Sequence, residues 1–140
     1  MLSQRVVGWD RQPTTPMLRI KEIAYTAYPI TDLARARHFY EGVLNLKVTT
    51  QFEHEGRHWV EYDVGPATLA ISNMSADKWK PSADGPAVAL EVEAFDAAIT
   101  ALRAASVTFL IDPMDTGVCR MAIIADPDGN SLVIHQRRAA

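Results

Sequence analysis

The stretch Asp126-Pro127-Asp128-Gly129-Asn130 lies near the end of the second of two segments that follow the same pattern. Residues 23–73 and residues 86–136 each begin with a short apolar strand, continue with an amphipathic helix and end in a run of short strands. A chain that repeats one unit usually places its ligand cavity where the two units meet. The sequence therefore predicts a tandem repeat with a ligand cavity between its halves.

The composition is that of one soluble globular domain. The chain has 140 residues, of which 48% are hydrophobic and 22% charged, enough for a core but few to enclose an active site alone. The net charge of −3 and the pI near 5.7 argue against nucleic acid or an anionic membrane as partner, because both require a clustered basic face. Cys119 is the single cysteine, which excludes an internal disulfide and favours a reduced, cytoplasmic protein.

The domain boundaries follow from where the periodic segments begin. Residues 1–17 contain no apolar run long enough for a signal peptide or a membrane span, and we expect them to form a flexible extension. Residues 18–140 are predicted to form a single domain of two modules, which cover about 20–73 and 86–137.

Each module is predicted to run strand, helix and then three strands. Thr31 or Asp32 offers a side-chain oxygen to cap the first helix, whose apolar residues recur at helical spacing. Turn residues separate the strands. The predicted strands cover residues 20–28, 47–52, 58–64 and 68–72 in the first module and 87–92, 108–111, 119–124 and 131–136 in the second, with helices over 32–43 and 96–105.

Strand alternation predicts which side chains face the cavity. Successive side chains of a strand point to opposite faces, and the helices cover the more apolar face. The apolar residues of strand 58–64 therefore belong under a helix, which leaves Trp59, Glu61 and Asp63 on the cavity side. The same rule turns His135 of the last strand inward.

Two motifs carry a resemblance to a known family. The first is Asp32-Leu33, followed by Phe39-Tyr40-Glu41 and then Leu44-Asn45-Leu46, and the second is the stretch at 126–130. Together with the repeated modules, these motifs resemble the vicinal oxygen chelate superfamily, which includes glyoxalase I, extradiol dioxygenases, epimerases and drug-resistance proteins. The resemblance implies an α+β fold of two tandem βαβββ modules, whose curved mixed sheets surround a cavity. It also implies a homodimer.

The resemblance further indicates where a metal would be bound. Members with metal chemistry place His, Gln or Glu at four inward positions, which correspond here to Tyr25, Ala70, Ala87 and Val133. Three of these side chains have no donor atom, and a phenol is an uncommon ligand for the cations concerned. We therefore predict no metal cofactor at these positions.

A displaced metal site is an alternative. His54 and His58 lie in one hairpin with Glu53, Glu55 and Glu61. His58 has the opposite strand parity to Glu61, and polar hairpin tips are usually solvated. The solvated hairpin is therefore the favoured interpretation.

Six residues are predicted ligand contacts: Tyr25, Trp59, Glu61, Asp63, Arg120 and His135. An aromatic and acidic wall suits a flat or cationic guest. Each residue also has a structural interpretation. The two carboxylates can lie in water at the rim or pair with arginines, Arg120 can form a salt bridge, Tyr25 can fill the space of a lost metal, and His135 can be a hydrogen-bonded wall residue.

The sequence therefore favours a binding protein that lacks the usual metal ligands. We expect metal-independent binding or sequestration of a small molecule that is flat or cationic, by a homodimer that binds neither nucleic acid nor membrane. The alternative is an enzyme of the glyoxalase, isomerase or dioxygenase type. Such an enzyme would use Glu61, His135 or Tyr25 for acid–base chemistry without metal, or a displaced metal site.

Overall fold

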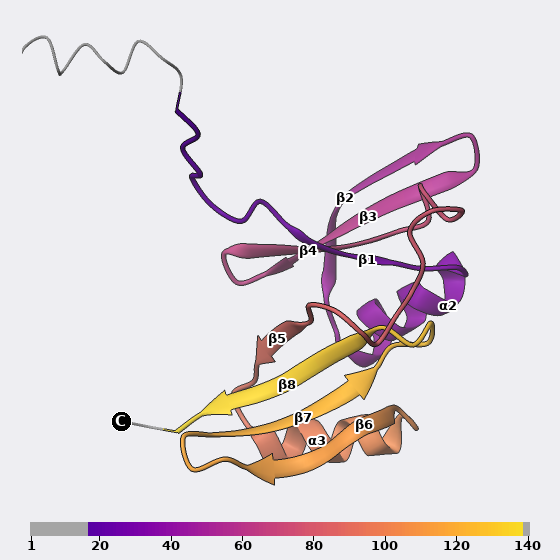
Figure 1. Ribbon diagram of the computed structural model, residues 1–140. Coiled ribbons are helices and arrows are strands. Elements are labelled where there is room, and N and C mark those ends of the chain that lie inside the picture. The colour runs from indigo at the N-terminus through magenta and orange to yellow at the C-terminus, as the bar shows by residue number, and fades with distance from the viewer. Residues whose placement is uncertain (1–16, 139–140) are drawn as a thin grey trace, which may run out of the picture.

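The computed structural model describes residues 17–138, which form two four-stranded mixed sheets with one helical segment each (Figure 1). The first sheet has the strand order β1-β4-β3-β2 and the second has the equivalent order β5-β8-β7-β6. The first module consists of β1 (Thr26–Pro29), α2 (Leu33–Arg37), η2 (His38–Val43), β2 (Lys47–His54), β3 (Arg57–Val64) and β4 (Ala67–Ser72). The second consists of β5 (Val88–Glu91), α3 (Phe95–Ala104), β6 (Thr108–Asp115), β7 (Cys119–Ala125) and β8 (Ser131–Arg137). The predicted α+β fold of two βαβββ modules is confirmed.

The strand registers of the two modules are equivalent. In the first sheet β1 pairs with β4 in parallel, and Ala27 lies opposite Ala70. In the second sheet β5 pairs with β8 in parallel, and Ala89 lies opposite Val133. Each remaining strand pair is antiparallel. The repeat seen in the sequence is therefore a repeat of topology and of register.

The first helical segment begins as predicted and then changes type. The Asp32 side chain accepts a hydrogen bond from the Arg35 backbone N–H at 3.0 Å, as an N-cap does. The α-helix passes at His38 into the wider π-helix η2, which continues to Val43. Phe39 and Tyr40 are consecutive, and both are buried in this segment.

The two modules share one hydrophobic core. Its members lie on the helix-covered faces of both sheets, as strand alternation predicted for Val60 and Tyr62. The large fully buried side chains come from both halves of the chain and include Tyr40, Tyr62, Phe95, Ile30, Leu69, Ile71, Ile124 and Leu132. Because the helix-covered faces meet in this core, the opposite face of each sheet is left open.

The turn at residues 126–130 joins the modules (Figure 1). The Tyr40 hydroxyl donates to the Asp126 carboxylate at 2.7 Å, and the Asn130 side-chain amide donates to the carbonyl of Pro29 at 2.8 Å. Asp128 accepts a hydrogen bond from Arg35 at 2.9 Å. Gly129 has a φ of 91°, a value that only glycine adopts without strain. The stretch that identified the repeat therefore also anchors one module to the other.

Strand β1 is shorter than predicted, because it begins at Thr26 and not at residue 20. Thr26 lies opposite Leu69, and β4 begins at Ala67, directly after a turn. Residues before 24 therefore have no length of β4 with which to pair. They form an arm, residues 18–23, whose Leu18, Ile20 and Ile23 side chains are at least 80% exposed.

Three further sequence-based expectations concern the N-terminal residues, the length of strand β6 and a membrane-spanning helix. The flexible extension predicted for residues 1–17 lies outside them, except for Met17. Strand β6 continues to Asp115, past the predicted end at 111, with irregular pairing around Pro113. No helix within residues 17–138 has the length and apolarity needed to cross a membrane.

Candidate ligand-binding site

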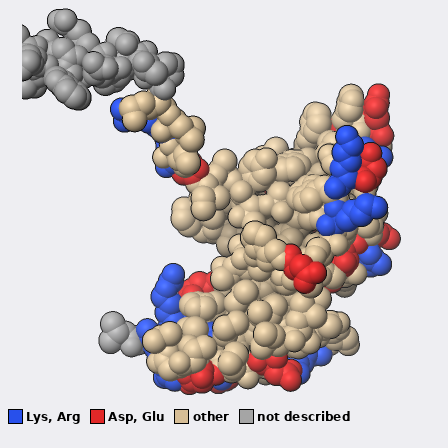
Figure 2. Space-filling view, viewed as in Figure 1, with Lys and Arg blue, Asp and Glu red and all other residues tan. Residues whose placement is uncertain are grey.

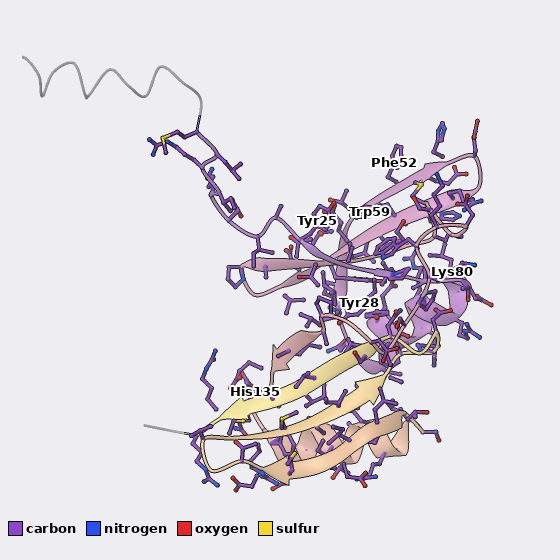
Figure 3. The ribbon with its side chains drawn as sticks, viewed as in Figure 1. Tyr25, Tyr28, Phe52, Trp59, Lys80 and His135 are labelled. Atoms are coloured by element: carbon purple, nitrogen blue, oxygen red, sulfur yellow. The ribbon has the colours of Figure 1, made fainter. Side chains whose placement is uncertain are left out.

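An aromatic and acidic cluster occupies the open face of the first sheet (Figure 3). The Tyr25 and Trp59 rings meet edge to face, with 5.0 Å between their centroids. The Trp59 indole N–H donates to the Glu61 carboxylate at 2.8 Å. Phe52 of β2 lies opposite Trp59 and is 59% exposed. Three predicted residues are thus brought together, and the cluster also contains an aromatic side chain that the sequence analysis did not select.

Phe52 escaped the sequence analysis because its face depends on the partner strand. Alternation within residues 47–54 does not show which side is open, since most of these residues are exposed. The register with β3 decides it, because Phe52 pairs with Trp59 across the hairpin. The short turn at Glu55-Gly56 could have indicated this register, because a tight turn fixes how the two strands pair. Together with the predicted face of Trp59, it would have placed Phe52 on the open side.

Asp63 shares the open face but lies at its margin. It pairs with Lys47 in the strand register and is exposed, whereas Glu61 is half-buried beside Trp59. Solvent screens an exposed carboxylate strongly. Asp63 therefore adds charge at the margin of the face, while Glu61 lies beside the Trp59 ring.

A second polar group lies on the open face of the second sheet. The His135 Nδ1 atom is 2.6 Å from a carboxylate oxygen of Glu91, and the other oxygen of Glu91 accepts the Arg137 backbone N–H at 2.7 Å. These hydrogen bonds, from Arg137 and then from His135, lower the pKa of the Glu91 carboxyl. Figure 3 shows His135 on β8, in the other half of the molecule from Tyr25 and Trp59.

Arg120 is not part of either open face, which corrects the sequence-based assignment. Its guanidinium pairs with Asp96 at 2.6 Å and lies over the Phe95 ring, 4.6 Å from the centroid. Arg120 has the strand parity of the buried Ala122, whereas Cys119 has that of Met121 on the open side. The hydrogen bond with Asp96 raises the pKa of Arg120. We therefore remove Arg120 from the candidate contacts.

A groove of about 370 Å³ lies between the two sheets. Its walls come from Thr26, from residues 64–69 and from residues 88–91, so that Glu91 lines it directly. Figure 2 shows the surface hollowed between the two halves at the left of the view. The open faces themselves are exposed in a single chain, with Tyr25 at 50%, Ile111 at 43% and Met114 at 47%.

The four positions that the family resemblance assigns to a metal do not fit one. Tyr25 and Ala87 are exposed residues that precede β1 and β5, Ala70 is fully buried, and Val133 is half-buried. One phenol and three aliphatic side chains do not make a site for a divalent cation. Within residues 17–138, no three His, Cys, Asp or Glu side chains are grouped as metal ligands would be.

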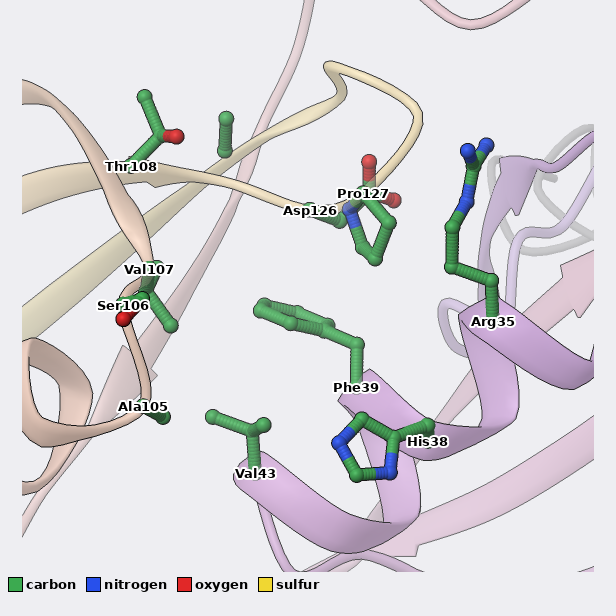
Figure 4. A pocket seen from close by; sticks show the side chains of 11 residues that line it. Arg35, His38, Phe39, Val43, Ala105, Ser106, Val107, Thr108, Asp126 and Pro127 are labelled. Atoms are coloured by element: carbon green, nitrogen blue, oxygen red, sulfur yellow. The ribbon is translucent and has the colours of Figure 1, made fainter.

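Another cavity, of about 330 Å³, lies at the module junction, between η2 and the start of β6. Phe39 lines it together with Val43, Val107 and Pro127, and His38 and Arg35 lie at its side (Figure 4). The Arg35 guanidinium is already paired with Asp128. This cavity contains none of the predicted ligand contacts.

Comparisons with known proteins agree with this architecture. A family model described as the Glyoxalase/Bleomycin resistance protein/Dioxygenase superfamily matches residues 22–134. No curated protein matches the chain.

Solved structures resemble the chain over most of its length. The antibiotic binding protein TnmS3 from Streptomyces sp. CB03234 superposes with a TM-score of 0.72 at 18% identity, covering 87% of this chain and 100% of that one. The trypanothione-dependent glyoxalase I of Leishmania major gives 0.69 at 22% identity, covering 84% and 87%. A glyoxalase family protein from Enterococcus faecalis gives 0.63 at 21%, covering 83% and 98%. At these identities the likeness shows the shared fold.

Proposed function

We propose, from the premise that this chain belongs to the glyoxalase/bleomycin resistance protein/dioxygenase superfamily, that it binds a small, flat molecule without using a bound metal ion. The observation that carries the proposal is the cluster of Tyr25, Trp59 and Glu61 on the open face of the first sheet. The family-typical metal positions hold no suitable donor set.

The chemistry of the cluster favours a flat guest with positive charge. Exposed aromatic rings offer apolar surfaces on which a planar molecule stacks, and the π-face attracts a cation. The Glu61 carboxylate is held beside the Trp59 ring by the indole N–H, and Asp63 adds negative charge along the same strand. The similarity of the fold to an antibiotic binding protein supports binding and sequestration as the activity.

A second copy of the chain is the second part of the proposal. The hydrogen bonds that join the modules within one chain come from Tyr28, Tyr40, Thr31, Arg35 and Asn130, which lie at the shared core or beside it. The open faces do not take part, and their apolar side chains are about half exposed. A twofold-related copy that places its second sheet over this first sheet would bury both open faces and enclose the guest.

The arm at residues 18–23 supports the same assembly. Its three large apolar side chains are exposed, and its own sheet offers it no strand partner. Arg19 and Lys21 lie between these apolar residues and give the arm basic side chains as well. The acidic open face that carries Glu61 and Asp63 is a complementary surface for the arm of a second copy.

Isothermal titration calorimetry can test the binding function, because it measures affinity without relying on a tryptophan that the key variant removes. N-Methylquinolinium and naphthalene are planar probes of similar size that differ in charge. We expect saturable binding with preference for the cation, and a loss of at least about tenfold in affinity in Trp59→Ala, since the stacking surface is removed. Thr100→Ala, at an exposed position of α3 away from both open faces, is the control. Equal, non-saturable signals from wild type and Trp59→Ala would contradict the proposal.

The alternative function is an enzyme that performs acid–base chemistry without a metal. The specific observation in its favour is the His135–Glu91 pair, because a histidine oriented by a carboxylate is a common general base. Chromatography of the guest recovered from the complex separates the two functions. Unaltered guest supports binding and sequestration, whereas a converted product supports the enzyme.

A further inference from the structure

We propose that His135, oriented by Glu91, accepts a hydrogen bond from a hydroxyl group of the guest, so that the site selects flat molecules that carry an acidic aromatic hydroxyl. This inference rests on the proposed function and narrows its ligand class.

The first step is the location of the proton on His135. The Glu91 carboxylate accepts the Arg137 backbone N–H with one oxygen and faces His135 Nδ1 with the other. The lowered pKa of Glu91 keeps this carboxylate ionised, so that it has no hydrogen to donate. The Nδ1 atom must therefore carry the hydrogen of the 2.6 Å hydrogen bond.

The second step follows from the tautomer. A neutral imidazole with its hydrogen on Nδ1 has a lone pair on Nε2, which is a hydrogen-bond acceptor. Within residues 17–138, no hydrogen bond to His135 Nε2 is formed, and the side chain remains 25% exposed. The acceptor is therefore free for a ligand.

The third step is the direction in which this acceptor lies. His135 shares the open face of the second sheet with Glu91 of β5 and Met121 of β7, its neighbours on either side. The charged groups around it are Glu91 itself and Arg137, whose guanidinium is 3.7 Å from Glu91. Glu91 also lines the groove between the sheets. A guest held against the open faces therefore contacts the Nε2 acceptor of His135 and, beside it, the apolar side chain of Met121.

An aromatic hydroxyl is the donor that fits this acceptor best. It is more acidic than an aliphatic alcohol, it lies in the plane of a flat guest, and it hydrogen-bonds strongly to imidazole nitrogen. A site that hydrogen-bonds a hydroxyl discriminates well against an analogue without it, because the acceptor is then left unpaired. Glu91 acts as a positioning residue in this scheme, since it contacts His135 and not the guest.

A matched pair of probes tests the inference. 6-Hydroxy-N-methylquinolinium and 6-methoxy-N-methylquinolinium share charge and shape and differ in the hydroxyl hydrogen. We expect the wild-type protein to bind the hydroxyl probe about tenfold tighter, the equivalent of one hydrogen bond. His135→Leu should abolish this preference while retaining affinity for the methoxy probe.

Glu91→Gln separates positioning from simple packing. The glutamine amide can donate to Nδ1 and so move the imidazole hydrogen to Nε2, which turns the acceptor into a donor. We expect the hydroxyl preference to be lost, and the nitrogen NMR signals of His135 to show the exchanged tautomer. Glu93→Gln, an exposed neighbour of the same charge change, should retain the preference.

The outcomes distinguish failure of the hydroxyl inference from failure of the proposed function. Equal affinity of the wild-type protein for both probes would overturn the hydroxyl inference and leave the binding function intact. Retained hydroxyl preference in His135→Leu or in Glu91→Gln would also overturn it. Binding of neither probe by the wild type would overturn both the inference and the proposed function.

Discussion

Tyr40 is a single residue on which both modules depend. Its hydroxyl donates to the Asp126 carboxylate at 2.7 Å, and both side chains are buried. Tyr40→Phe removes one donor from a buried carboxylate, and we expect the free energy of unfolding to fall by about 1–3 kcal/mol. Urea denaturation measures this loss. Tyr25→Phe, at a half-exposed ring, is the matched control and should stay within about 0.5 kcal/mol of wild type.

The same buried tyrosines predict how stability depends on pH. Burial is the main cause that raises the pKa of Tyr28, Tyr40 and Tyr62 above the ordinary value. In the unfolded chain these phenols ionise near pH 10, while in the folded chain they remain protonated at that pH. Their contribution to stability is therefore complete below about pH 10 and declines as the pH rises above it.

We expect the free energy of unfolding to fall by on the order of 2 kcal/mol between pH 9.5 and pH 11. Urea denaturation over this range measures the slope, and Tyr40→Phe should make the slope shallower. A slope that is unchanged in Tyr40→Phe would contradict the buried position of this phenol.

At the scale of the element, one strand serves two purposes. In β8, Leu132 and Ile134 are buried in the core, while Val133 and His135 lie on the open face. A shift of the strand by one residue would exchange these two sets, so the core also fixes the direction of His135. The site on the second sheet thus depends on the packing of the opposite face.

The arm at residues 18–23 has a proposed role in the dimer. This role can be tested without disturbing the fold. Ile20→Glu places a charge where the proposed dimer buries an apolar side chain. We expect the dissociation constant of the dimer to rise at least about tenfold, because burial of an isoleucine contributes about 1.5–3 kcal/mol. Sedimentation velocity measures the monomer–dimer equilibrium.

Thr100→Glu is the control for the arm variant, since it introduces the same charge at an exposed position of α3, away from the arm and from the open faces. The far-ultraviolet circular dichroism of both variants should match that of wild type, because the isoleucines of the arm are exposed in the single chain. A wild-type protein that sediments as a monomer at micromolar concentration would contradict the proposed assembly.

At the scale of the whole molecule, the proposed dimer predicts a composite site. One copy would supply Trp59 from its first sheet, and the other would supply His135 from its second sheet. Trp59→Ala and His135→Leu should each lack tight binding of 6-hydroxy-N-methylquinolinium. After subunit exchange in an equal mixture, about half of the dimers carry one intact site, so that about a quarter of all sites recover tight binding.

Fluorescence titration of the exchanged mixture measures the recovered fraction. A mixture without tight sites, although exchange of subunits has been verified by mass spectrometry, would place the whole site within one chain. It would leave the binding function itself untouched, since that function is tested with the wild-type protein.

The sequence by itself determined the order of the elements and the covered face of most strands. These features depend on local periodicity and on turn-forming residues, and both signals lie within short stretches of the sequence. The helix capped by Asp32 and the buried positions Val60 and Tyr62 were predictable for this reason. The conjunction of the two motifs with the repeat also identified the family.

The tertiary structure alone decided which side chains pair across distant strands. Glu91 meets His135, Arg120 turns to Asp96, and Phe52 joins Trp59, although nothing in each strand's own alternation specifies the partner. It also decided that β1 starts at Thr26, because β4 supplies no partner before Ala67. Strand register is set by contacts between segments far apart in the chain, and a local pattern carries no information about where a distant strand begins.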